Sequence, residues 1–167
     1  MKVSVLFVCL GNICRSPTAQ GLFQYYVDRA KLEDAILVDS AGTGSWHECE
    51  PPDSRAQSVA LGKGYDISHL RGRSIDSNDF LNFDYILAMD DQNLLFLENM
   101  KPSDYCGDLG LFLKIANNQG DQDHTDNKKM QVPDPFYGDV THFENVMALI
   151  DDGSKNLLAK IRERHDI

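Results

Sequence analysis

The sequence predicts an α/β fold of three layers, in which a four-stranded parallel sheet carries helices on both of its faces. Two observations support this prediction. Short β-branched and aliphatic runs, typical of strands buried on both faces, alternate with segments whose apolar residues recur at helical spacing. Strands that alternate with helices form parallel sheets with right-handed crossovers. Because no internal repeat or linker interrupts the 167 residues, we expect residues 1–167 to form a single domain.

The first half of the chain contains two predicted strands and two predicted helices. Residues 2–8 and 35–40 are the aliphatic runs that predict the first two strands. Between them, Pro17 fits the first position of a helix, and the apolar residues after it recur at helical spacing. After a loop rich in Gly, Ser and Pro, a short helix is expected over residues 54–63, with Gly64 as its C-terminal stop.

The second half contains two further strands and two further helices. Residues 84–89 and 109–115 predict the third and fourth strands, and residues 91–99 predict a helix between them. Residues 117–131 are polar and are expected to be irregular, whereas residues 141–164 predict a long final helix. Ligands of parallel sheets bind beyond the carboxyl ends of the strands, so we expect the functional site at that edge.

Composition and charge argue against several classes of protein. The net charge of −10 argues against a nucleic-acid partner, which requires a basic surface. No apolar run approaches the ~20 residues of a membrane span, and the apolar residues 3–8 are too few for a secretory signal. We therefore expect a cytoplasmic protein without a membrane partner, and by default a monomer.

The cysteines show no pattern of a metal site or of a disulfide framework. Cys9, Cys14, Cys49 and Cys106 form no CxxC pair, which argues against a zinc knuckle and a thioredoxin-type motif. His47 lies close to Cys49 in the sequence, but two candidate ligands do not complete a metal site. We therefore expect no bound metal.

The segment Cys9-Leu-Gly-Asn-Ile-Cys-Arg-Ser16 follows the first predicted strand and predicts a phosphate-binding loop. The backbone N–H groups of such a loop and the N-terminus of the next helix attract an anion. Gly11 and Asn12 supply the unusual backbone angles of a curled loop, and Arg15 presents a planar fork to two phosphate oxygens. The same donors favour a nucleophilic thiolate at Cys9, to which the Ser16 hydroxyl can donate. Between Cys9 and Arg15 the loop consists of Leu10, Gly11, Asn12, Ile13 and Cys14.

An alternative interpretation treats this segment as structural. Most free cysteines are buried and inert, so Cys9 could be a core thiol and Arg15 a surface charge. The spacing of a cysteine and an arginine is by itself a modest signal. The strand before the segment, the Ser-Pro helix start after it and the Gly-Asn pair inside it together favour the functional interpretation.

The run VCLGNICRSPTAQG resembles the signature of the low-molecular-weight protein tyrosine phosphatases. The resemblance extends over nearly the whole chain, through segments that have the order and spacing of that family: Asp39-Ser40-Ala41, Pro51-Pro52-Asp53, Arg55, Ser68-His69, Phe83-Asp84-Tyr85-Ile86-Leu87, Met89-Asp90 and Asp134-Pro135-Phe136-Tyr137-Gly138. It implies hydrolysis of phosphotyrosine in other proteins through a phosphocysteine intermediate. Inorganic phosphate would be the product, and no cofactor would be needed.

The resemblance gives roles to a carboxyl group and to three aromatic residues. Asp134 lies in a turn stiffened by two prolines, where composition alone leaves the choice between a turn residue and an acid even. The resemblance implies that Asp134 is the general acid and later the base. Trp46 and Tyr137 are the candidates for the walls of a phosphotyrosine slot, with Phe136 as a neighbour. Ordinary core packing is the alternative for these rings.

The resemblance also implies a set of supporting residues. Asn12, Ser40 and His69 correspond to a hydrogen-bond network beneath the phosphate loop. Such a network would hold the strained backbone of Asn12. Asp90 matches a family position as well, and it could either orient Arg15 or cap the following helix.

Cysteine chemistry defines both a form of regulation and the competing functions. The resemblance suggests that Cys14 forms a reversible disulfide with Cys9, although simple packing of Cys14 is the alternative. An arsenate reductase on the same scaffold would need further cysteines, and Cys49 and Cys106 are far apart in the sequence. A non-catalytic phosphotyrosine-binding module would need neither a thiolate nor Asp134. Both competitors therefore fit the sequence less well than a phosphatase.

Overall fold

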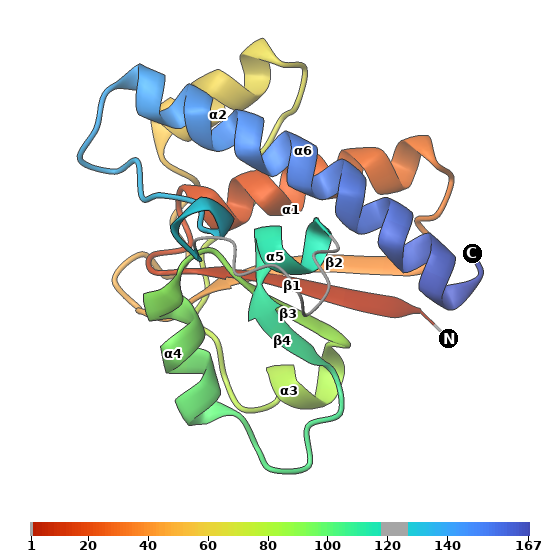
Figure 1. Ribbon diagram of the computed structural model, residues 1–167. Coiled ribbons are helices and arrows are strands. Elements are labelled where there is room, and N and C mark those ends of the chain that lie inside the picture. Colours follow the sequence, from red (N-terminus) through yellow and green to blue (C-terminus); the bar gives the residue numbers. More distant parts are fainter. Residues whose placement is uncertain (1, 118–126) are drawn as a thin grey trace.

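Four parallel strands form the central sheet and confirm the predicted fold class (Figure 1). The computed structural model describes residues 2–117 and 127–167. The strands span Val3–Cys9 (β1), Ile36–Gly42 (β2), Tyr85–Ala88 (β3) and Asp108–Leu111 (β4). They lie in the order β2-β1-β3-β4, and every pairing is parallel. The carboxyl ends of β1, β2 and β3 therefore meet at one edge of the sheet.

Helices cover both faces of this sheet, as the sequence predicts. Those of the described chain span Arg15–Arg29 (α1), Ser54–Gly62 (α2), Asp79–Asn82 (α3), Asp91–Met100 (α4), Phe112–Ala116 (α5) and Val140–His165 (α6). Figure 1 shows α1, α2, α5 and α6 on one side of the sheet and α3 and α4 on the other. The three layers follow from this arrangement.

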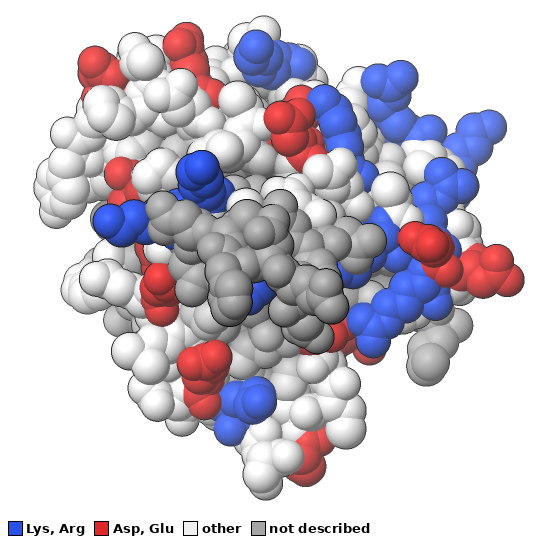
Figure 2. Space-filling view, viewed as in Figure 1, with Lys and Arg blue, Asp and Glu red and all other residues white. Residues whose placement is uncertain are grey.

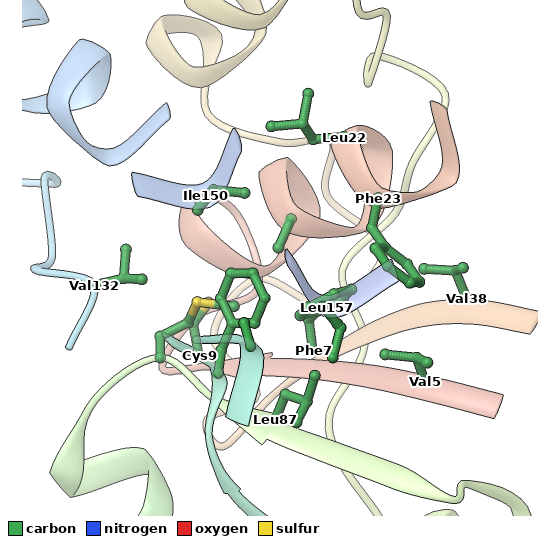
Figure 3. Close-up of a cluster of buried hydrophobic side chains, with 14 of the residues drawn as sticks. Val5, Phe7, Cys9, Leu22, Phe23, Val38, Leu87, Val132, Ile150 and Leu157 are labelled. Carbon is green, nitrogen blue, oxygen red and sulfur yellow. The ribbon is translucent and has the colours of Figure 1, made fainter. Parts of the chain in front are cut away.

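The side chains of β1 alternate between two hydrophobic cores. Val5, Phe7 and Cys9 belong to the core that α1, α5 and α6 cover, whereas Leu6 and Val8 belong to the core against α3 and α4. All five are buried, as expected of a strand that lies between two layers. Figure 3 shows Cys9 in the same cluster as Phe7, so the candidate nucleophile is built into the core of the protein.

The prediction of a strand over residues 109–115 is wrong in its second half. β4 ends at Leu111, where its partner strand β3 ends at Ala88, and the chain continues as α5. In α5 the apolar side chains are buried on one helical face while Lys114 is exposed. A short apolar run fits a buried strand and a buried helix equally well, and the length of β3 decides between them here.

Smaller differences concern the ends of elements. Pro17 is the third residue of α1 rather than the first, still within the first turn, where a backbone N–H is not needed. The single turn of α3 was not predicted. Of the predicted irregular segment 117–131, residues 118–126 lie outside the described residues, and Asn127–Met130 form a 3₁₀ turn (η1).

The long helix α6 has favourable groups at both ends. At its start, Asp139 and His142 form a reciprocal capping box. Arg162 and Arg164 lie in its last turn, where cations complement the helix dipole, and Figure 2 shows Lys and Arg side chains gathered on that side of the molecule. Gly153 does not interrupt the helix. A Cβ at Gly153 would lie 2.8 Å from side chains of α5, so glycine admits close packing of the two helices.

No helix among the described residues is long and apolar enough to cross a membrane.

Replacing Phe7 by Ala should lower the free energy of unfolding by about 3–5 kcal/mol. Its fully buried ring has edge-on contacts with Phe23 and Phe112, at centroid distances of 5.7 and 5.1 Å. Urea denaturation measures the loss. As a control, Leu81→Ala removes a side chain that is 77% exposed and should change stability by less than about 0.5 kcal/mol. A cost of less than about 1 kcal/mol for Phe7→Ala would contradict this packing.

Candidate active site

The loop after β1 curls back toward the sulfur of Cys9. The backbone N–H of Asn12 donates to Cys9 Sγ at 3.3 Å, and Ser16 Oγ lies 3.0 Å from the same sulfur. Both Cys9 and Ser16 are buried. Because α1 begins at Arg15, its N-terminal turn adds a positive field to this loop. The predicted phosphate-binding loop is thus formed at the carboxyl end of the strand.

Asn12 holds the curl of this loop. Its backbone has φ of 55°, the left-handed region, which costs a residue with a Cβ about 1 kcal/mol. The buried amide compensates: Nδ2 donates to Ser16 Oγ at 2.8 Å and to Ser40 Oγ at 2.9 Å, and Oδ1 accepts from the Arg73 N–H at 2.9 Å. Because Ser16 Oγ accepts from Asn12, its own proton can be donated to Cys9 Sγ at 3.0 Å or to the Ala41 carbonyl at 3.4 Å. The loop therefore supplies a donor to a thiolate.

The network continues from Ser40 to Gln20 rather than to His69. The Ser40 hydroxyl donates to Gln20 Oε1 at 2.6 Å. His69 is exposed, and the Ser40 hydroxyl bonds with Asn12 and Gln20, so the expected role of His69 in the network stays a prediction. Gln20 lies on α1, four residues after Ser16, and therefore on the same helical face. That spacing is the sequence signal that would have identified Gln20.

Arg15 is almost fully buried and is held by groups from two other segments. Its Nη1 donates to Asp90 Oδ2 at 2.5 Å and to the Val132 carbonyl at 3.1 Å, and its Nη2 lies 3.5 Å from Asp134 Oδ2. Burial lowers the pKa of the guanidinium, but Cys9 and Asp90 offset this effect, and the net pKa is raised. Arg15 therefore remains a cation beside Cys9.

Asp90 fulfils both roles that the sequence left open. While Oδ2 receives Arg15, Oδ1 accepts the Asn93 N–H at 2.8 Å and so caps α4. Asp90 comes two residues after the end of β3, which places it at the carboxyl edge of the sheet. One carboxylate thus fixes the arginine to the scaffold.

The segment around Asp134 lies over the same edge. The Val132 N–H donates to the Met89 carbonyl at 2.8 Å, and the Val132 side chain is fully buried. Asp134 Oδ1 accepts the Phe136 N–H at 3.1 Å, and the carboxylate remains about 39% exposed. The segment is therefore anchored, while the carboxyl group of Asp134 remains accessible.

The loop after β1 and the segment around Asp134 line one cavity of about 280 Å³. Trp46 is 69% exposed and Tyr137 is 95% exposed, which argues against core packing for these two rings. Phe136 is half-buried and contacts Tyr137 edge-on at a centroid distance of 5.0 Å. The lining residues are Cys9, Leu10, Gly11, Ile13, Cys14, Arg15, Trp46, His47, Asp134, Phe136 and Tyr137.

His47 also lines this cavity, although sequence reasoning considered it only as a metal ligand. Its Nδ1 lies 2.6 Å from Glu50 Oε2, and its ring packs so closely on Gly11 that a Cβ there would lie 3.2 Å from His47 Cδ2. Its position next to Trp46 in the sequence was the available signal. Within residues 2–117 and 127–167, no group of three or more potential ligands forms a metal site.

Cys14 lies on the same loop as Cys9 but in a different environment. Both thiols are buried and free. Burial raises the pKa of Cys14, and the nearby carboxylate of Asp53 raises it further. Cys14 is therefore a protonated thiol at neutral pH.

A buried cysteine and arginine on a curled loop, beneath an accessible carboxyl group, define a cysteine-dependent phosphatase scaffold. Residues 4–166 match the family described as low molecular weight phosphotyrosine protein phosphatase. A low molecular weight phosphotyrosine protein phosphatase of Schizosaccharomyces pombe is 39% identical over 161 residues, 96% of this chain and 97% of the relative. A low molecular weight protein-tyrosine-phosphatase of Bacillus subtilis is 37% identical over 165 residues, 99% of each chain. The chain therefore belongs to the low molecular weight protein-tyrosine phosphatases, a family of cysteine-based hydrolases.

Solved structures agree with this assignment. The crystal structure of a protein tyrosine phosphatase from Entamoeba histolytica superposes with a TM-score of 0.87 at 36% identity, covering 98% of this chain and 99% of that chain. The structure of a Drosophila arginine phosphatase superposes with a TM-score of 0.83 at 32% identity, covering 97% of this chain and 98% of that chain. The fold of this chain is thus shared by relatives whose names differ in the phosphorylated residue.

Iodoacetate should alkylate Cys9 at least about tenfold faster than Cys14 at pH 7, because only the thiolate reacts and the raised pKa keeps Cys14 protonated. Tandem mass spectrometry must locate the adduct, since both residues share one tryptic peptide. Cys9→Ser should leave Cys14 slow to react, and inorganic phosphate should protect Cys9. Alkylation of Cys14 as fast as that of Cys9 would contradict the expectation that Cys9 is the reactive thiolate of the loop.

Proposed function

We propose that this protein removes phosphate from tyrosine side chains of other proteins, with Cys9 as nucleophile, Arg15 as phosphate ligand and Asp134 as general acid and base. One observation carries the proposal. Cys9 and Arg15 come from the two ends of one loop, Asp134 comes from a segment more than 100 residues away in the sequence, and all three line the same cavity. Their convergence is the combination that a two-step displacement at phosphorus requires.

Binding of the phosphate is attributed to local donors. The protein carries a net charge of −10, so its overall field opposes a dianion. Arg15 counters this field from within the cavity, together with the N–H groups of the loop and the N-terminus of α1. Because Asp90 already fixes Arg15 Nη1, the guanidinium is oriented before the substrate arrives.

The proposed reaction proceeds in two steps. The Cys9 thiolate attacks phosphorus, the S–P bond forms and the P–O bond to tyrosine breaks, while Asp134 donates a proton to the departing oxygen. Asp134, now a carboxylate, then takes a proton from water as the water attacks phosphorus. The S–P bond breaks, inorganic phosphate leaves, and the Ser16 hydroxyl stabilises the returning thiolate. The scheme balances without a cofactor.

The walls of the cavity support an aromatic substrate. Trp46 and Tyr137 are exposed rings at its mouth, and ring pairs of this kind contribute about 0.5–1.5 kcal/mol beyond their area burial. Phosphoarginine is the second candidate substrate, because one solved relative is an arginine phosphatase and aromatic faces also bind guanidinium groups. Phosphotyrosine agrees with the names of the family and of both sequence relatives.

Arsenate reduction receives less support. That chemistry needs a further thiol to carry electrons away from Cys9. Cys106 precedes β4 and therefore lies at the opposite edge of the sheet from the carboxyl ends that carry Cys9. Cys49 does not line the cavity.

Action as a cytoplasmic monomer also stays a proposal. A reducing compartment would keep Cys9 available as a thiolate and the four cysteines free. A reversible disulfide between Cys9 and Cys14 is likewise proposed, and their shared position on one loop supports it.

Cys9→Ser should abolish hydrolysis of p-nitrophenyl phosphate and of a phosphotyrosine peptide, measured with chelator and reductant present. Asp134→Asn should lower kcat/KM for the peptide by about 10²–10⁴-fold, the usual contribution of general acid catalysis. Glu163→Asn, on the exposed side of α6, is the control and should be fully active. Turnover by Cys9→Ser, or none by the folded wild type, would refute the proposal.

The wild type should prefer a phosphotyrosine peptide over phosphoserine and phosphoarginine peptides of the same sequence. Trp46→Ala should raise KM for the phosphotyrosine peptide about tenfold, the equivalent of one lost aromatic contact. Inhibition by inorganic phosphate should stay unchanged, since phosphate has no ring. A higher kcat/KM for the phosphoarginine peptide would instead identify phosphoarginine as the preferred substrate.

A further inference from the structure

The segment Pro51-Pro52-Asp53 with Arg55 belongs to the sequence resemblance, but the proposed reaction gives it no role. Arg55 lies in the first turn of α2, and its side chain is 35% exposed. Its guanidinium binds Asp53 through two nitrogens, Nε at 3.0 Å from Oδ1 and Nη2 at 2.9 Å from Oδ2. This bidentate pair fixes the orientation of the guanidinium plane.

Other contacts of Arg55 are with the segment that carries Asp134 and with the first turn of α6, which follows it. Its Nη1 donates to the Gly138 carbonyl at 3.4 Å. The guanidinium carbon lies 5.5 Å from the ring centroid of Phe136 and 4.6 Å from that of Phe143, within the range of cation–π contacts. Phe136 and Gly138 follow Asp134 by two and four residues. Arg55 therefore holds the C-terminal side of the acid segment.

The N-terminal side of the same segment is held independently. The Val132 N–H donates to Met89, and the Val132 carbonyl accepts from Arg15. Asp134 thus lies between two anchors, one at β3 and one at α2. If the contacts of Arg55 are lost, the C-terminal side of the segment keeps only the packing of Phe136 on the core and its link to α6, and we expect the carboxyl group of Asp134 to be held less firmly.

The α2 anchor is itself connected to the phosphate loop. The Asp53 N–H donates to the Ile13 carbonyl at 2.8 Å, so the start of α2 is tied to the loop that holds Cys9. Asp53 also accepts the Arg55 N–H at 2.8 Å and caps the helix. A continuous series of contacts therefore leads from Ile13 through Asp53 and Arg55 to Phe136.

We infer that Arg55 is a positioning residue that sets the location of Asp134 relative to Cys9. The inference rests on the proposed role of Asp134 as general acid. Arginine is required because one group must pair with a carboxylate through two nitrogens and stack on two rings at once. Lysine, a point charge on a flexible stem, can make one of these contacts but not both.

The test is the dependence of kcat/KM on the leaving group. Phenyl phosphate and phosphotyrosine need a proton on the departing oxygen, whereas 2,4-dinitrophenyl phosphate leaves readily as an anion. Arg55→Lys and Arg55→Met should lower kcat/KM for phenyl phosphate by about 10–100-fold, because displacement of a catalytic group by about 1 Å costs up to about 10²-fold. For 2,4-dinitrophenyl phosphate we expect less than about a threefold loss.

Two matched variants complete the design. Arg71→Met removes an exposed arginine whose side chain, within residues 2–117 and 127–167, bonds to the nearby carbonyls of Ser68 and Leu70, and it should behave as wild type. Asp134→Asn should show the same leaving-group dependence as the Arg55 variants, and more strongly. Circular dichroism and thermal unfolding establish that each variant is folded, and Arg55→Lys provides a milder change if Arg55→Met does not fold.

Equal losses for all leaving groups in the folded Arg55 variants, or no loss at all, would overturn the inference while leaving the proposed function intact. If Asp134→Asn lowered kcat/KM equally for all leaving groups, the proposed role of Asp134 as general acid would be refuted, and the inference about Arg55 with it. The two failures are therefore distinguishable within a single set of assays.

Discussion

The left-handed backbone of Asn12 is the constraint on which the rest of the site depends. The curl of the loop that directs the Asn12 N–H at the Cys9 sulfur includes this unfavourable conformation, and the Asn12 side chain stabilises it with three hydrogen bonds. The partners come from α1, from β2 and from the segment at Arg73, whose guanidinium is in turn held by Asp39 and Asp79. Elements distant in sequence thus converge on one buried amide. The parallel sheet makes this convergence feasible, because it brings the ends of β1, β2 and β3 to one edge.

A second constraint is the balance of charge around Arg15. A buried cation is costly unless it is paired, and Asp90 pairs with it while remaining fixed as the cap of α4. Asp134 lies farther from the guanidinium and is more exposed. The two carboxylates therefore have different environments: Asp90 is fixed between Arg15 and the start of α4, whereas Asp134 stays accessible to solvent. This division follows from their positions, one at the end of a strand and one in a turn between prolines.

Features of the fold that depend on a local sequence pattern could be predicted from the sequence alone. These features are the strands, the long helices and the loop from Cys9 to Ser16. A buried strand and a loop that wraps around an anion each require particular residue types at neighbouring positions, so the sequence predicts them. The sequence did not predict features that depend on which of two distant segments occupies one position in the fold. The boundary of β4 depends on the length of β3, and the partner of Ser40 depends on whether Gln20 or His69 reaches it. The contact of Arg55 with Gly138 spans 83 residues and has no local signature. The family resemblance proposed the site residues, but only the folded chain shows how their side chains are held.

Direct detection of the covalent intermediate would test the central claim, that Cys9 accepts the phosphoryl group. In Asp134→Asn the hydrolysis of the intermediate loses its proposed base, so the phosphocysteine should accumulate after the protein is mixed with p-nitrophenyl phosphate. Acid quenching followed by tandem mass spectrometry would locate the phosphoryl group. The account predicts one phosphoryl group on Cys9 and none in Cys9→Ser. A phosphoryl group on another residue, or release of p-nitrophenol without any covalent intermediate, would contradict it.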